Sequence, residues 1–304
     1  MRHLLDQPPK RDIKMRNYLT EFFKDFEYDT EDAEHLLCAY GKITADARAC
    51  RILDEALAAY GESIDIDYEE QILKRSKEIS NIIEIHPYTT DLLLFICMTK
   101  RLEQVYAERG LDMQIYHDSV LDLKWKLEEC KTVRGICGSF VAFWFPRFFS
   151  LKCFALGRLQ FEVTLMKCDY EKNGIRLEKD KSRVINVHIP RTGTPMDKES
   201  CDKAYALARE FFKDQVDVCA FVCHSWLLFP KNLEILPAHT NTCKFISEFD
   251  IMDWGYNEGQ DLWRLFDTHE MNPNRLPTNG SLRRCYAEHL KAGGRVGWGY
   301  GIKF

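Results

Sequence analysis

The hydrophobic pattern of this 304-residue chain changes its period near Gly135. Before that residue, apolar side chains recur every three or four positions, as in ACRILDEALAAYG (49–61), which is typical of amphipathic helices. After it, short segments rich in aromatic and β-branched residues are separated by turn residues, which is typical of strands. We therefore predict an α+β chain with an all-helical domain over 1–136 and, over 137–304, a mixed, mostly antiparallel sheet with few helices.

The periodicity also predicts where the individual elements lie. Helices are predicted in the first domain at 10–25, 30–42, 49–61, 68–84, 88–108 and 112–130. Strands are predicted in SFVAFWF (139–145), RLQFEVTLMK (158–167), RVINVHI (183–189), VCAFVCHSW (218–226), CKFISEFDI (243–251) and DLWRLF (261–266). Two helices, at about 195–213 and 279–292, interrupt these strands.

Composition limits the partners and the compartment. A formal charge of −5 gives no basis for general nucleic-acid binding. The longest apolar run, LLLFICM (92–98), is too short to cross a bilayer, and MRHLLDQPPKRD (1–12) lacks the apolar core of a signal peptide. The twelve cysteines are scattered without a CxxC pair, so free core thiols are favoured over disulfides or a metal site. We expect a cytoplasmic protein with no membrane partner and no bound metal, while its oligomeric state stays open.

The segment RVINVHIPRTGTPMDKESC (183–201) combines a strand, a tight loop and a helix. Alternation places Asn186 and His188 on one face of the strand, while the other face is wholly apolar. The loop RTGT precedes a helix, where unpaired N–H groups and the helix dipole favour an anion. The loop is therefore a candidate diphosphate site, with Arg191 balancing charge, although an ordinary strand-to-helix turn explains it as well.

The start of this helix has its own signals. Thr194 is suited to the N-cap position and Pro195 to the first helical position, with Asp197 as the acidic member of a capping box. The stripe that begins at Cys201 and Tyr205 is predicted to be buried.

Two histidines are predicted to lie near each other. A strand, a crossover helix and a second strand usually form a parallel pair, so His188 and His224 fall near the ends of neighbouring strands. Histidine titrates near neutrality and can accept a proton from an attacking nucleophile. Cys223 lies beside His224 but faces the other side of the strand, which leaves Cys201 as the candidate for a reactive thiol.

Three segments resemble a known family: VINVHIPRTGTPMDKESCDKAYALAREFF (184–212), FVCHSWLLFP (221–230) and LRRCYAEHLKAGG (282–294). They are similar to bacterial acyltransferase-domain proteins, in which an N-acyltransferase N-terminal domain precedes a GNAT-like C-terminal domain. The resemblance implies that the strand ending at His188 splays away from the strand at 218–226, and that acyl-CoA occupies the splay. The loop PRTGTPMD departs from the Q/R-x-x-G-x-G/A pattern of these enzymes, since it holds one glycine and Pro195 lacks an N–H.

The resemblance implies direct acyl transfer from a CoA thioester, such as acetyl-CoA as cosubstrate, to an amine or another small acceptor. His188 or His224 is then the general base, and Tyr205 or Tyr286 the proton donor to the leaving thiolate. The loop residues expected to bind the cosubstrate are Ile189, Arg191, Thr192, Gly193, Thr194 and Met196. Two alternatives stay open: a catalytically inactive protein that binds CoA, another ligand or a partner on the same fold, and a thioesterase-like hydrolase that uses Cys201.

The C-terminal segment is rich in glycine, with five glycines over 292–301. Such a run suits close approach to a ligand or a flexible end. Basic residues make the same end a weak candidate for contact with the CoA phosphates: Arg283, Arg284, Lys291 and Arg295.

Overall fold

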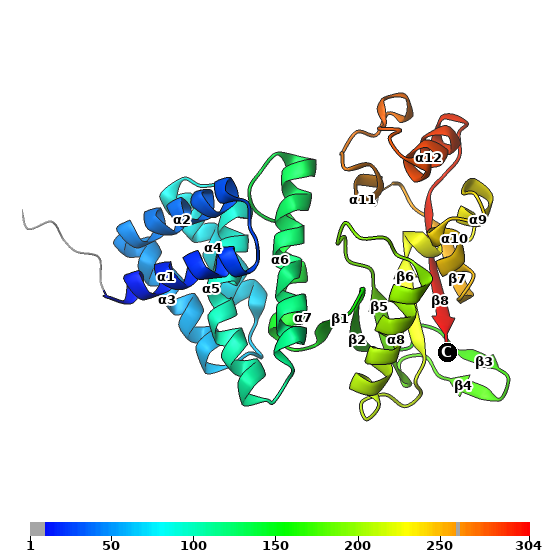
Figure 1. Cartoon of the computed structure of the whole chain (residues 1–304), viewed down its shortest axis with the longest axis horizontal. Coiled ribbons are helices and arrows are strands. Elements are labelled where there is room, and N and C mark those ends of the chain that lie inside the picture. The colour runs from blue at the N-terminus through cyan, green and yellow to red at the C-terminus, as the bar shows by residue number, and fades with distance from the viewer. Residues whose placement is uncertain (1–9, 260–261) are drawn as a thin grey trace, which may run out of the picture. The chain divides into compact units, whose positions relative to one another are not determined.

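A computed structural model describes residues 10–259 and 262–304 of the chain. The N-terminal residues used in the signal-peptide argument, up to position 9, and residue 261 of the predicted strand DLWRLF lie outside this description. The chain folds as two compact units, the first ending at Leu151 and the second beginning at Lys152 (Figure 1). The change in hydrophobic period predicted a domain boundary after residue 136, whereas the two compact units meet fifteen residues later, after Leu151.

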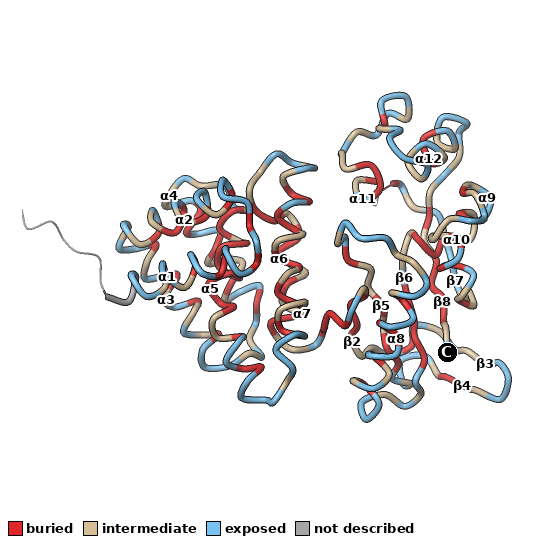
Figure 2. The backbone as a smooth tube through the Cα atoms, in the orientation of Figure 1, coloured by how far each residue is buried: buried red, intermediate tan, exposed pale blue. Residues whose placement is uncertain are grey.

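The first unit is helical, and all six helices predicted from the periodicity are confirmed. Its long elements are α1 (Lys10–Asp25), α2 (Thr30–Ala45), α3 (Ala47–Glu62), a π-helical turn η1 (Glu69–Leu73) that continues into α4 (Lys74–Ile83), α5 (Pro87–Glu108) and α6 (Met113–Arg134). The apolar run at 92–98 lies within α5 and is buried on every side, as expected for the central helix of a bundle (Figure 2). None of the helices in the described parts of the chain is long and apolar enough to span a membrane.

The segment after α6 corrects one predicted strand. Residues 139–145 form a loop and a 3₁₀ turn, η2 (Ala142–Trp144), followed by the short helix α7 (Pro146–Phe149). Phe149 is buried, its ring lies 5.0 Å from that of Phe95 in α5, and its carbonyl accepts a hydrogen bond from the Tyr60 hydroxyl at 2.9 Å. The aromatic residues therefore complete the core of the first unit, which explains why this unit extends to Leu151.

The second unit contains a six-stranded mixed sheet of order β1-β2-β5-β6-β8-β7 and a separate β3-β4 hairpin, which confirms the predicted α+β class. The strands are β1 (Cys153–Leu156), β2 (Leu159–Leu165), β3 (Tyr170–Lys172), β4 (Ile175–Leu177), β5 (Arg183–His188), β6 (Phe221–Ser225), β7 (Asp250–Tyr256) and β8 (Gly297–Lys303). As predicted, β5 and β6 pair in parallel and are connected by the crossover helix α8 (Lys198–Phe212).

The two faces of this sheet differ. On one, here called the helix face, Tyr205 of α8 packs against Phe161 of β2 and Phe221 of β6, with a ring distance of 4.7 Å to Phe221. The opposite face carries a small apolar cluster that includes Val184 and Val222. Beyond this cluster, toward the carboxyl ends of β5 and β6, it becomes polar, and we call it the polar face.

The last third of the chain corrects two further strand predictions. Residues 243–246 lie in helix α10 (Asn241–Ile246), which is capped by the Thr240 side chain, and only 250–251 belong to a strand, the start of β7. Residues 262–266 form helix α11 (Leu262–Phe266). Short apolar runs do not distinguish a strand from a buried helical turn, and here burial against neighbours decides the conformation. The helix α12 (Ser281–Lys291) is confirmed, and the other short elements are η3 (Trp226–Leu228), α9 (Asn232–Ile235) and η4 (Pro273–Arg275).

The C-terminal glycines serve packing within the fold. Strand β8 lies directly against η3, and a Cβ at Gly299 would lie 2.1 Å from the carbonyl oxygen of Leu228. A Cβ at Gly297 would lie 2.2 Å from the carbonyl oxygen of Gly255. These glycines let the strand approach other backbone closely, and Gly297–Lys303 form strand β8 and not a flexible end.

Candidate functional site

Strands β5 and β6 separate at their carboxyl ends. Their parallel register pairs Ile185 with Phe221 and Asn186 with Val222. Past this point β5 continues against β2, where His188 lies opposite Gln160, and β6 continues against β8, where His224 lies opposite Tyr300. The strands thus form a V whose arms end near the two histidines.

A carboxylate holds His188 at the end of β5. Nε2 of His188 lies 2.8 Å from Oε1 of Glu162 on β2, and the Asn186 amide donates to the same oxygen at 3.1 Å. Glu162 and Asn186 are register partners, so the three side chains share the polar face. Their side chains are largely shielded from solvent, with 22% of His188 and 16% of Glu162 exposed. The amide nitrogen of Asn186 also lies 3.1 Å from Nε2 of His188, so the three side chains form one polar cluster. A carboxylate can only accept a hydrogen bond, so a proton on Nε2 would be donated to Glu162.

Glu162 was not predicted from the sequence, although a signal for it exists. It lies in the predicted strand 158–167, where Gln160, Glu162 and Thr164 alternate with apolar residues. A polar face on β2 beside a polar face on β5 would have suggested that the two strands are neighbours.

His224 lies in different surroundings. It is exposed, and its ring centroid lies 4.7 Å from that of Trp298 and 6.3 Å from that of Tyr300. Because Val222 is opposite Asn186 in register, His224 and His188 lie on the same face of the two strands. The structure therefore brings the two predicted histidines to one face, each with its own neighbours.

The loop from Ile189 to Asp197 is held by an arginine that was not predicted from the sequence. The Arg158 guanidinium, in the β1–β2 turn, donates to the carbonyls of Pro190 at 3.1 Å, Thr194 at 3.1 Å and Pro195 at 3.3 Å. Burial lowers the pKa of Arg158. A guanidinium has several N–H donors and can bind several carbonyls at once, so Arg158 stabilises the conformation of this loop.

The helix after this loop begins later than predicted. Asp197 is the N-cap of α8, and its carboxylate accepts the N–H of Ser200 at 2.9 Å. Thr194 instead lies within the loop, where its hydroxyl is 2.6 Å from that of Thr192. The predicted cap at Thr194 is therefore wrong, because an aspartate at the last loop position competes better for the free N–H groups of the first turn.

The remaining loop residues lie around a turn. Gly193 has a φ of +75°, which favours glycine at this position. Ile189 and Met196, at the two ends of the loop, are partly buried. The Arg191 guanidinium binds Asp267, which also binds Arg283 of α12. Two of the predicted phosphate-binding cations thus share one carboxylate, and together they retain one net positive charge beside the loop.

The predicted proton donors lie elsewhere. Tyr205 is buried on the helix face, and Tyr286 donates a hydrogen bond to Asn232 in the core beneath α12. Burial raises the pKa of both hydroxyls above the ordinary tyrosine value. The structure does not bring either residue to the polar face where the histidines lie.

Cys201 is also poorly suited to act as a nucleophile. It is 3% exposed, and burial raises the pKa of its thiol. A reactive cysteine has a lowered pKa and an accessible sulfur, so these properties speak against a thioesterase that uses this residue. Within the described residues, no group of three or more His, Cys, Asp or Glu side chains is arranged to hold a metal ion.

The first unit contains a separate cavity, lined by Asp91, Glu69, Lys77 and aromatic residues that include Phe143. Burial raises the pKa of Asp91 to about 6. Its lining contains no histidine, whereas the polar face of the second unit carries two, so we take the polar face as the catalytic candidate.

Comparisons with known proteins agree with this architecture. Residues 17–151 match the N-acyltransferase N-terminal domain, and residues 153–303 match the GNAT-like C-terminal domain. The first match ends where the first compact unit ends. No curated protein matches the chain.

Solved structures of similar fold also exist. An acyltransferase in complex with decanoyl-CoA and teicoplanin superposes with a TM-score of 0.73 at 19% identity, covering 94% of this chain and 87% of that chain. A mutant acyltransferase in complex with octanoyl-CoA gives the same values. An acyltransferase in complex with decanoyl-CoA gives a TM-score of 0.69 at 19% identity, covering 98% and 89%. At this identity the likeness establishes a shared fold.

Proposed function

Because the chain belongs to the acyltransferase family that joins an N-acyltransferase N-terminal domain to a GNAT-like C-terminal domain, we propose that it transfers an acyl group from an acyl-CoA to an amine. The structures of similar fold hold octanoyl-CoA or decanoyl-CoA, which favours a medium-chain donor over acetyl-CoA. One of them also holds teicoplanin, which favours an amine on a glycopeptide-like molecule as the acceptor class.

The observation that carries this proposal is the carboxylate-held histidine beside the V of β5 and β6. The acyl-CoA thioester lies in the V, and the acceptor amine attacks its carbonyl carbon from the polar face. A C–N bond forms, the C–S bond breaks so that CoA leaves as its thiolate, and the amine proton passes to His188, from which the thiolate can regain a proton. The Glu162 carboxylate, 2.8 Å from Nε2, stabilises the imidazolium that results.

The backbone of β5 supplies a group for the developing negative charge. The N–H of Ile185 donates to the carbonyl of Ala220, the residue just before β6, at 2.9 Å. N–H groups two residues apart point to the same side of a strand, so the N–H of Ile189 is directed toward the β6 side, where the strands have separated. This N–H is the oxyanion donor of the proposal.

The loop from Ile189 to Asp197 binds the CoA phosphates in this proposal. Gly193 and Thr192 contribute to a turn that Arg158 holds in shape, and Arg191 contributes charge. The Asp197 carboxylate occupies the first turn of α8, so the phosphates rely on the loop more than on the helix end.

The test is incubation of the purified chain with octanoyl-CoA and a panel of amines, including a glycopeptide aglycone amine and amino sugars. Thiol release and acylated product are measured together by mass spectrometry. Product formation that His188→Ala abolishes, with CoA binding retained, would support the proposal. Saturable CoA binding without transfer to any acceptor would favour the alternative, a catalytically inactive CoA-binding protein.

A further inference from the structure

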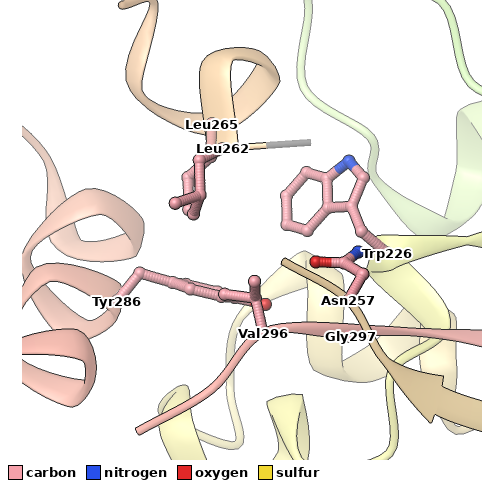
Figure 3. A pocket seen from close by; sticks show the side chains of 7 residues that line it. All are labelled: Trp226, Asn257, Leu262, Leu265, Tyr286, Val296 and Gly297. Atoms are coloured by element: carbon pink, nitrogen blue, oxygen red, sulfur yellow. The ribbon is translucent and has the colours of Figure 1, made fainter. Parts of the chain in front are cut away.

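Two cavities, one in each unit, differ greatly in size. The cavity at the carboxyl end of β6 is lined by Trp226, Leu262, Leu265 and Tyr286, whose side chains Figure 3 shows turned toward a common space. Its volume is about 10 Å³, which is room for about one water molecule. The cavity of the first unit has a volume of about 240 Å³ and is open to solvent, so it has room for an organic molecule.

The walls of this larger cavity come from four segments of the first unit. Glu69 and Leu73 belong to the π-helical turn η1, Lys77 belongs to α4, and Asp91 lies near the start of α5. Residues 139–143 provide the remaining wall. π-Helical turns are rare and are frequently found at functional sites, so the position of η1 in the wall is a first indication of a ligand.

The wall formed by 139–143 packs tightly against α5. The N–H of Ser139 donates to the carbonyl of Tyr88 at 2.9 Å, and a Cβ at Gly138 would lie 2.5 Å from the same oxygen. The Ser139 side chain is fully buried, and its hydroxyl accepts the N–H of Val141 at 3.3 Å. In the part of the chain that the structure describes, the proton of this hydroxyl has no acceptor, so it is available to an oxygen atom that enters the cavity.

Two carboxylates face the cavity without a bound cation. Among residues 10–259 and 262–304, no ion pair involves Asp91 or Glu69, although Lys77 lines the same cavity. Burial, with a smaller effect of Glu69, raises the pKa of Asp91 to about 6, and the nearby Ser76 hydroxyl opposes this rise. A carboxylate that has lost water and gained no counter-ion is stabilised by a cation that enters beside it.

The rest of the lining is apolar and determines what kind of cation fits: Leu73, Pro87, Phe140, Ala142 and Phe143. Phe143 is 62% exposed, so its ring is accessible to a ligand. A metal ion would gain little from such walls, and two carboxylates supply fewer ligands than Ca²⁺ or Mg²⁺ prefers. An anion is disfavoured, because two carboxylates outweigh the single ammonium group of Lys77. An organic ammonium ion satisfies both parts of the lining, since aromatic rings also attract cations.

We propose that the cavity of the first unit is a binding site for an organic ammonium ion with an apolar or aromatic body. Asp91 and Glu69 are its anionic partners, and Phe143 contacts its apolar part. The site is separate from the residues of the proposed acyl transfer, because its lining belongs wholly to the first unit whereas those residues belong to the second.

The test is calorimetric titration of the full chain with 2-phenylethylammonium chloride and, as the uncharged analogue, 2-phenylethanol. The ammonium compound is expected to bind saturably and at least about tenfold more tightly than the alcohol. Asp91→Asn keeps the shape of the side chain but removes its charge, so it should weaken binding of the ammonium compound about tenfold or more. Asp25→Asn, at an exposed position of α1, is the matched control and should leave the Kd within about twofold.

Two further measurements address the folding of the variants and the charge of Asp91. Asp91→Asn should not lower the Tm, because it removes a carboxylate without a counter-ion, and Phe143→Ala should weaken binding about three- to tenfold with the Tm unchanged. Lowering the pH from 7.5 to 5 leaves about a tenth of Asp91 ionised, so the affinity of the wild type should fall about tenfold. Asp91→Asn retains the other charged groups of the lining, Glu69 and Lys77, and should lose this pH dependence.

The outcomes separate this site from the proposed function. If the ammonium compound does not bind saturably, if 2-phenylethanol binds as tightly, or if Asp91→Asn binds like Asp25→Asn, the cavity does not recognise the cation and the inference fails. If Glu162→Gln abolishes binding while Asp91→Asn retains it, the amine occupies the acceptor site of the second unit, and the inference fails while the proposed function gains support. If acyl transfer is never observed but binding depends on Asp91, the proposed function fails and the ammonium site stands.

Discussion

The carboxyl ends of β5 and β6 carry the same residue type in different settings. At the end of β5, His188 is largely shielded and held by Glu162, and the loop after it is fixed by Arg158. At the end of β6, His224 is exposed against the ring of Trp298, and the chain turns at once into η3 beside an apolar cavity. The two ends therefore differ in what the proposed function asks of them: the β5 end is assigned proton transfer and phosphate contact, whereas the exposed His224 at the β6 end is assigned neither.

The largest effect should follow from His188→Ala. Removal of a positioned general base typically lowers the rate by about 10²- to 10⁴-fold, so turnover with octanoyl-CoA should fall by roughly that amount while the Kd for CoA stays within about twofold. His239→Ala, at an exposed position of the same unit, is the control. Steady-state turnover and calorimetry measure both quantities. Unchanged turnover would show that His188 is not the general base, and the functional difference between the two strand ends would no longer hold.

A smaller effect is expected from Glu162→Gln. The amide keeps the shape of the side chain but loses its charge, and a hydrogen bond to a charged group contributes about 1.5–3 kcal/mol, so kcat should fall by about ten- to a hundredfold. The KM for acyl-CoA should stay constant, because Glu162 does not contact the donor in the proposal. Glu162→Asp should restore part of the loss, and Glu171→Gln, at an exposed position on β3, should change neither constant. A rise in KM with kcat unchanged would assign Glu162 to binding instead.

The helical unit was largely predictable from the sequence, because the three- to four-residue spacing of apolar side chains within each segment is sufficient to indicate a helix. The parallel pairing of β5 and β6 was also predictable, because two strands connected by a helix usually pair in parallel with a right-handed crossover. Aromatic runs were not predictable: 139–145 and 262–266 have strand composition but are helical turns that fill cores. Their conformation depends on which surface they cover.

The candidate site could be predicted only in part. The two histidines follow from strand alternation within their own segments, whereas Glu162 depends on the register between β2 and β5, and the chain between these strands forms a separate hairpin. Arg158 donates hydrogen bonds to three backbone carbonyls of a loop that lies more than thirty residues later in the sequence. Contacts of this kind arise from the assembled sheet, so a local pattern cannot reveal them.

The loop at the end of β5 gives the next prediction. Arg158→Ala removes three hydrogen bonds to backbone carbonyls, so the Kd for CoA should rise by about tenfold through disorder of the loop, with kcat at saturation reduced by less than about threefold. Arg158→Lys keeps the charge but loses the planar fork, and it should resemble the alanine variant. Calorimetry with CoA measures the change. A lysine variant with wild-type affinity would show that charge, and not the shape of the loop, is what Arg158 contributes.

The smallest effect is expected at the end of β6. His224→Ala removes an exposed ring that contacts Trp298 and lies opposite Tyr300 in the register, so turnover should fall by less than about threefold. The double variant with Glu162→Gln is the sharper measurement, because it removes the carboxylate that distinguishes His188 from His224. If His224 takes no part in proton transfer, the double variant should be as active as Glu162→Gln within about twofold. A further loss of tenfold or more would mean that His224 accepts the proton when His188 is no longer held, and the two strand ends would then share one task.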